Sequence, residues 1–266
     1  MRIAVCVKQV PNTEARLRVA PDGRWIDQED LSLILNENDT YALEEGLRLA
    51  EAHKGEVVVI TLGPDGAKEA LRKGLAMGAA RAVHLKDDGF LDGDASAVGR
   101  ALAAAVRHVE ADLVLTGSQS DDVGYAATGS IIAGELDWPH AWLVMGLEIA
   151  SADAGQATVV REMESGMNER AQVPLPAVIQ VQAGINQPRY ASLRGIMQAK
   201  RKPIDVLSPA DLGLDASQVG AAGSRIEIVD VAFPDSGAGA QLLEGDDAAQ
   251  LASQLVDKLR NEARVL

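Results

Sequence analysis

The sequence contains a single cysteine, Cys6, so the chain cannot form an intramolecular disulfide bond. Its four histidines lie far apart, and none has a cysteine or a second histidine at the spacing of metal ligands. We therefore expect neither a secreted disulfide scaffold nor a metal site.

The chain also lacks a long apolar run at its start and an excess of positive charge. Its first apolar run, residues 3–7, ends before Lys8 and is too short for a signal peptide or a membrane span. With 39 acidic against 25 basic residues, the net charge is −14. Nucleic acids and anionic membranes require a cationic partner. We expect a cytoplasmic protein that does not insert into membranes, does not bind nucleic acid, and interacts with proteins and small molecules.

What the chain does contain is the composition of a folded protein, with 47% hydrophobic and 24% charged residues. Short apolar runs alternate four times with helical patterns. Strands are expected at 3–7, 57–62, 82–85 and 113–116, and helices at about 39–54, 67–77, 95–108 and 128–136. Because the strands are continuously apolar, we predict an α/β fold with a doubly wound, mostly parallel sheet and helices on both faces.

Antiparallel pairs are expected outside this pattern. Residues 9–35 contain the turn signal Pro21-Asp22-Gly23 and are typical of a hairpin excursion. Residues 158–173 are expected to form a hairpin around Ser165-Gly166, followed by a buried strand at 175–181.

We divide the chain into an α/β nucleotide-binding domain, residues 1–203, and a C-terminal extended arm, residues 204–266. The arm is expected to lie outside the α/β core and to end in a helix over about 246–264. This helix has an apolar stripe that a short tail cannot bury by itself. The arm is therefore expected to pack on a partner chain.

A ligand is expected at the carboxyl ends of the parallel strands, where loops and helix N-termini converge. The segment 117–130 follows the fourth strand there. Gly124 and Gly129 permit close approach of a ligand to the backbone, and Thr128 and Ser130 at a helix start suit a phosphate. These features indicate a nucleotide site.

A second interpretation of the same residues stays open, because neither the dinucleotide fingerprint nor a Walker loop is present. Glycine and serine after a strand are also ordinary turn formers. Cys6, which ends the first strand, would equally serve as a small core residue.

A loop and short helix follow Pro188 and end in Lys200-Arg201-Lys202, a basic cluster in an otherwise acidic chain. In physical terms this cluster suits a helix C-terminus, where cations interact favourably with the helix dipole. On that interpretation Leu193 is a core residue.

The sequence nevertheless resembles the electron transfer flavoprotein β-subunit family. The residues that carry the likeness are Arg161-Glu162, Gly166, 175–178, Asn186, 188–193 and Ala199-Lys200, with further matches at Lys8, Asn36, Glu44-Glu45, Gly63-Pro64, 75–79, 112–114, Thr128-Gly129 and 136–139.

The resemblance implies the β subunit of a heterodimer whose α subunit holds most of an FAD, while the β subunit binds a structural AMP and helps to enclose the flavin. Such a protein relays electrons singly from flavin-containing dehydrogenases to a membrane quinone oxidoreductase. It is an electron carrier and not an enzyme, so no catalytic residue is expected.

By similarity, the cofactor-binding residues are Cys6, Asn36, Glu37, Asn38, Asp39, Leu62, Gly124, Tyr125, Ala126, Ala127, Thr128, Gly129, Ser130 and Ile131. The partner-binding residues are Arg189, Tyr190, Ala191, Leu193, Ile196 and Met197. Leu193 is the expected anchor for the donor dehydrogenase.

Two alternatives remain. Bifurcating members of the family carry a second FAD in place of AMP, and their loop after the fourth strand reads Asp-Gly-Asp-Thr followed by Gln-Val-Gly. The corresponding Ser120-Asp121-Asp122-Val123-Gly124 favours AMP, although Asp39 is similar to the bifurcating pattern. The other alternative is a stand-alone adenine-nucleotide binding module of the same α/β shape.

Overall fold

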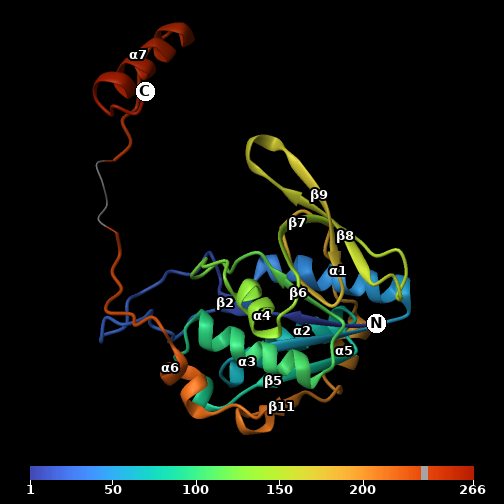
Figure 1. Cartoon of the computed structure of the whole chain (residues 1–266). Coiled ribbons are helices and arrows are strands. Elements are labelled where there is room, and N and C mark those ends of the chain that lie inside the picture. The colour runs from blue at the N-terminus through green and yellow to red at the C-terminus, as the bar shows by residue number, and fades with distance from the viewer. Residues whose placement is uncertain (235–238) are drawn as a thin grey trace.

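The computed structural model describes residues 1–234 and 239–266, and its centre is a nine-stranded sheet (Figure 1). The strand order is β11-β5-β4-β1-β6-β10-β7-β8-β9. The seven strands from β11 to β7 pair in parallel, whereas β8 pairs antiparallel with both β7 and β9. The bounds are β1 Arg2–Cys6, β4 Glu56–Leu62, β5 Arg81–Leu85, β6 Leu113–Gly117, β7 His140–Glu148, β8 Gln156–Glu162, β9 Asn168–Pro174, β10 Ala177–Val181 and β11 Asp205–Leu207. The predicted mostly parallel α/β sheet is confirmed.

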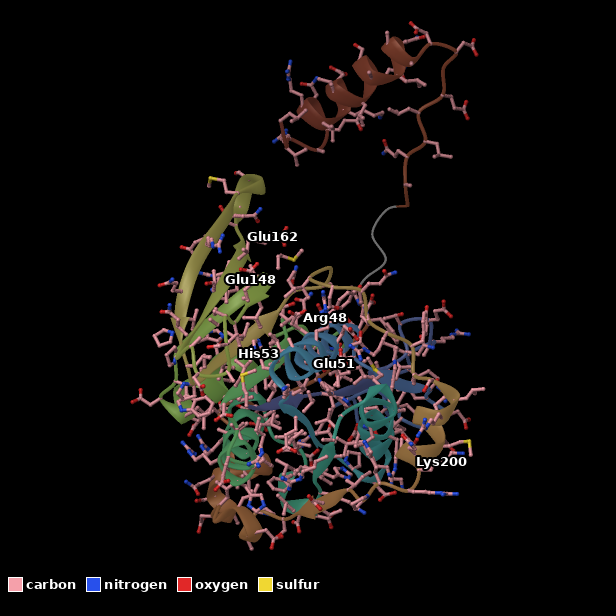
Figure 2. All side chains as sticks on the ribbon, turned by 90° about the vertical axis from the view of Figure 1, so that its right-hand side faces the viewer. Arg48, Glu51, His53, Glu148, Glu162 and Lys200 are labelled. Atoms are coloured by element: carbon pink, nitrogen blue, oxygen red, sulfur yellow. The ribbon has the colours of Figure 1, made fainter. Side chains whose placement is uncertain are left out.

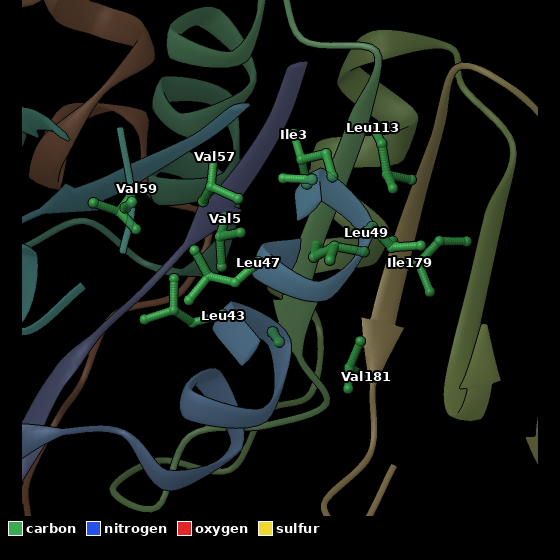
Figure 3. Close-up of a cluster of buried hydrophobic side chains, with 14 of the residues drawn as sticks. Ile3, Val5, Leu43, Leu47, Leu49, Val57, Val59, Leu113, Ile179 and Val181 are labelled. Atoms are coloured by element: carbon green, nitrogen blue, oxygen red, sulfur yellow. The ribbon is translucent and has the colours of Figure 1, made fainter. Parts of the chain in front are cut away.

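Helices cover both faces of this sheet, as predicted. The helices are α1 Glu37–His53, α2 Lys68–Met77, α3 Ala95–His108, α4 Thr128–Leu136, α5 Leu193–Ala199, α6 Gly220–Gly223 and α7 Ala248–Asn261. Successive residues of a strand point to opposite faces. In β1, Ile3 and Val5 therefore join the core under α1 and α2, whereas Ala4 and Cys6 join the core under α3 and α4. Figure 3 shows the first of these two cores, with Leu43 and Leu47 of α1 against β1.

The predicted antiparallel pairs are also present. Strands β2 (Gln9–Pro11) and β3 (Leu33–Leu35) pair antiparallel, and within the excursion Val19 forms a bridge with Ile26. The β8–β9 hairpin projects from the body of the molecule (Figure 1).

Two strands were not predicted. Strand β7 joins β10 on one side in parallel and β8 on the other in antiparallel fashion, so it is the transition from the doubly wound sheet to the hairpin. Strand β11 pairs with β5 at the opposite edge.

Because of β11, the expectation that the chain leaves the α/β core after Pro203 is wrong. Leu207, Leu212 and Leu214 pack against the core under α3, and Val219 is 1% exposed. An edge strand of three residues is too short to show a periodicity, which is why the sequence pattern missed it.

Residues 225–234 form neither a helix nor a strand, and the last helix of the described residues begins only at Ala248. No residue of α7 is buried, and the helix stands apart from the body in both views (Figures 1 and 2).

Candidate functional site

The crevice that the topology predicts lies between β1 and β6. From β1 the chain adds β4 and β5 on one side and then returns through α3 to add β6 on the other side. The helices that follow β1 and β6 therefore lie on opposite faces of the sheet, and the loops that lead to these helices diverge from each other. Such a switch point is the usual ligand site of an open parallel sheet.

Asp39, in the first turn of α1, joins the ends of these two strands. Its carboxylate accepts a hydrogen bond from Lys8 N at 2.7 Å and another from Gly117 N at 3.1 Å. A Cβ atom at residue 117 would lie 2.5 Å from Asp39 Oδ1, so this close approach requires glycine. Burial raises the pKa of Asp39 to about 7, although hydrogen bonds from Lys8, Asn36 and Gly117 act in the opposite direction.

Asn36, the residue before α1, holds the loop between β6 and α4. Its Oδ1 accepts from Asp121 N and its Nδ2 donates to Gln119 O, both at 3.0 Å. The same loop is held by Lys8, whose Nζ lies 2.6 Å from a carboxylate oxygen of Asp122. The loop is thus attached to both β1 and α1 before it reaches α4.

The loop ends in a backbone arrangement that suits an anion. Gly124 and Ala126 both have left-handed backbone conformations, with φ of 61° and 52°. Helix α4 then begins at Thr128, and no side chain in the described part of the protein caps its N-terminus. The first N–H groups of an uncapped helix lack intrahelical partners, and they attract negative charge.

The structure brings most of the predicted cofactor residues to this crevice. Asn36 and Asp39 contact the segments that follow β1 and β6, and residues 124–131 continue the second of these segments into α4. Asn38 is buried beside Ser118, whose Oγ lies 3.3 Å from Asn38 Oδ1. Glu37 is exposed, and Tyr125 is 55% exposed at the rim.

Cys6 and Leu62 lie deeper. Both pack in the core under α3, and Cys6 is buried. Burial, together with the nearby Asp39 carboxylate, raises the pKa of the Cys6 thiol to about 12, which keeps the thiol protonated and unreactive. The side chain of Cys6 therefore matches the interpretation as a small core residue.

Gln180 of β10 belongs to the crevice and was not predicted. Its amide contacts the β6–α4 segment, and Ser130 Oγ lies 3.0 Å from its Oε1. The sequence did contain a signal for it, namely a polar residue within the otherwise apolar strand 177–181. A buried polar residue normally requires hydrogen-bond partners. Across the residues that the structure describes, no group of three or more His, Cys, Asp or Glu side chains could hold a metal ion.

A second surface lies around α5. Tyr190 is 99% exposed and Leu193 is 84% exposed, and Ile196 and Met197 also reach solvent. The interpretation of Leu193 as a core residue is therefore wrong. Lys200 follows α5 on the same part of the surface (Figure 2).

Two predicted partner-binding residues face the protein instead. Arg189 forms ion pairs with Glu44 and Glu51 of α1, and Figure 2 shows Glu51 on that helix. Ala191 packs against the core under α1.

Comparison with known proteins gives one consistent result. Residues 24–212 match the family model of the electron transfer flavoprotein domain. The chain is 41% identical to the electron transfer flavoprotein subunit beta of Methylophilus methylotrophus, over 98% of this chain and 99% of the relative. It is 35% identical over the full length of both chains to the mitochondrial electron transfer flavoprotein subunit beta of Arabidopsis thaliana. Over 98% of its length it is also 36% identical to subunit CarD of the caffeyl-CoA reductase–Etf complex of Acetobacterium woodii.

Proposed function

Because the chain belongs to the electron transfer flavoprotein β-subunit family, we propose that it forms a heterodimer with an α subunit and serves as an electron carrier. In this heterodimer the α subunit holds most of the FAD, and this chain helps to enclose the flavin. The complex accepts single electrons from flavin-containing dehydrogenases and passes them to a membrane quinone oxidoreductase. No helix of the described residues is long and apolar enough to cross a membrane. The cytoplasmic location stays a prediction.

The crevice between β1 and β6 is the proposed site of AMP. The observation that carries this proposal is the uncapped N-terminus of α4 at the switch point of the sheet. The phosphate would accept hydrogen bonds from backbone N–H groups around 126–130, where the helix dipole also favours negative charge.

The second candidate is a bifurcating-type subunit that holds its own FAD in the same crevice. The match to CarD and the presence of Asp39 favour it. The β6–α4 loop supports AMP instead, because its sequence, residues 120–124, departs from the Asp-Gly-Asp-Thr and Gln-Val-Gly pattern of the bifurcating type.

One experiment separates these possibilities. The chain is co-expressed with its α subunit, purified, and its nucleotides are extracted and quantified with an absorbance spectrum of the complex. We expect a yellow heterodimer with one AMP and one FAD. A complex with two FAD and no AMP would show that the chain is a bifurcating-type subunit. A colourless nucleotide-bound homo-oligomer would show a stand-alone binding module.

The exposed surface around α5 is the proposed docking site for the donor dehydrogenase. Tyr190 and Leu193 present apolar groups to solvent on a loop that is attached to α1 through Arg189. A single apolar anchor suits a partner that must be released after each electron transfer.

The arm that packs on the α subunit is proposed to begin at about residue 225, later than the predicted 204. Beyond this point the side chains of Val229, Phe233 and Leu242 are 63–88% exposed. Together with α7 they form apolar surface that a partner chain could bury.

A further inference from the structure

Gln180 is a buried polar residue within an apolar strand. It is 2% exposed, and the other four residues of β10 are fully buried aliphatic side chains. A buried amide destabilises a protein unless its hydrogen-bonding groups are satisfied. The position of Gln180 therefore depends on the partners that surround it.

The amide of Gln180 uses every hydrogen-bonding position it has. Its Nε2 donates to Ser118 O and to Ala126 O, both at 3.3 Å. Its Oε1 lies 3.0 Å from Ser130 Oγ and 2.8 Å from His140 Nε2. An amide group has two donor hydrogens and two acceptor lone pairs, so no position remains free.

These partners determine the orientation of the side chain. Carbonyl oxygens only accept hydrogen bonds, so the NH₂ group must face Ser118 and Ala126. The Oε1 atom then faces Ser130 and His140, and His140 must carry its hydrogen on Nε2. His140, on β7, thus holds Gln180 from the side opposite to the crevice loop.

Three of the four partners belong to the segment that carries the anion site. Ser118 follows β6, Ala126 has a left-handed backbone that is unfavourable for a residue with a side chain, and Ser130 lies in the first turn of α4. The helix also rests directly on Gln180, because a Cβ atom at Gly129 would lie 2.4 Å from Gln180 Cγ.

We infer that Gln180 is a positioning residue, which fixes the first turn of α4 so that its N–H groups are oriented for the ligand's phosphate, with His140 in support. This inference rests on the proposed nucleotide site. Preorganised donors bind an anion more tightly because less order has to be imposed on binding.

The test replaces Gln180 by methionine, which has a similar length but cannot form these hydrogen bonds. In the heterodimer freed of nucleotide, amide hydrogen exchange in 124–130 should become faster. AMP should bind about tenfold more weakly, because part of the binding free energy must then order the first turn of α4.

The matched control is Val159→Ala in β8, a fully buried residue outside the crevice. It should lower the melting temperature while it leaves both the exchange of 124–130 and the affinity for AMP unchanged. If Gln180→Met shows the same exchange and affinity as this control, Gln180 is only a core residue and the inference is wrong.

Two further measurements keep the outcome of this test unambiguous. If the wild-type heterodimer does not bind AMP, the proposed nucleotide fails, but the exchange measurement on the nucleotide-free protein still tests Gln180. If Gln180→Met does not fold, His140→Leu removes one hydrogen bond and should produce a smaller acceleration of exchange in the same segment. Unchanged exchange in that variant would overturn the inference.

Discussion

The guanidinium of Arg189 binds both carboxylate oxygens of Glu44, with Nε 2.8 Å from Oε2 and Nη2 3.0 Å from Oε1. The backbone N–H of Arg189 donates to the same Oε2 atom at 3.1 Å. Glu44 is 5% exposed, and the exposed Glu51, about two turns further along α1, completes the contact. The segment that presents Tyr190 and Leu193 is thus bound to α1 through Arg189, which directly precedes Tyr190.

Arg189→Ala should destabilise the protein by removing the partner of a buried carboxylate. The expected decrease in the free energy of unfolding is about 3 kcal/mol, measured by denaturant titration. Glu51→Gln is the control, because its carboxylate is 61% exposed and should contribute less than about 1 kcal/mol. Equal effects of the two variants would contradict the central role of Glu44.

Leu193→Ala should impair docking without affecting the fold. Because Leu193 is 84% exposed, the melting temperature should stay unchanged. Loss of an apolar anchor should weaken binding of the donor dehydrogenase by about 2 kcal/mol, or roughly thirtyfold, measured as the concentration dependence of flavin reduction.

The control for this prediction is Leu115→Ala in β6, which is fully buried and should destabilise the protein by about 2–5 kcal/mol. Normal reduction kinetics in the Leu193 variant would show that docking uses another surface.

The sheet could largely be predicted because its central strands are continuous apolar runs that alternate with helical patterns, one of which begins with a capping residue. Asp94, for example, accepts a hydrogen bond from Ala97 N at the expected start of α3. Strand β7 was missed because its residues alternate irregularly between buried and exposed positions and include Gly146. Such a pattern fits neither a two-sided core strand nor a regular amphipathic one.

The location of the crevice could be predicted from topology, but its internal bonds could not. Asn36 illustrates this difference. Helix α1 begins at Glu37, earlier than expected, and Asn36 uses its side chain to hold the β6–α4 loop instead of capping the helix. Gln180 likewise depends on partners from two separate segments, 118–130 and β7, and this proximity exists only in the folded chain.

Truncation after residue 234 should weaken association with the α subunit without destabilising the folded body of the protein. No residue of α7 is buried, so the melting temperature of the isolated chain should change little. Association with the α subunit should weaken by tenfold or more, on the order of the loss of a few interface anchors, and analytical ultracentrifugation would measure it. Unchanged association would mean that the arm does not pack on the α subunit.

The buried carboxyl of Asp39 should make stability depend on pH. Its pKa is raised from 3.8 to about 7 in the folded protein, so between about pH 4 and 7 the folded state binds more protons at this site than the unfolded state. The contribution of Asp39 is therefore fully present below about pH 4 and is lost as the pH rises through 7. Its size is on the order of a few kcal/mol.

Asp39→Asn isolates this contribution, because other carboxylates act in the opposite direction. Hydrogen bonds to Asp122 outweigh its burial and lower its pKa, so its contribution to stability is lost as the pH falls. The informative quantity is therefore the free energy of unfolding of the wild type minus that of the variant, measured from pH 4 to pH 8. This difference should decrease with rising pH and level off above about pH 7. A difference that stays constant or increases would show that Asp39 is ionised throughout this range, held as a carboxylate by the N–H groups of Lys8 and Gly117.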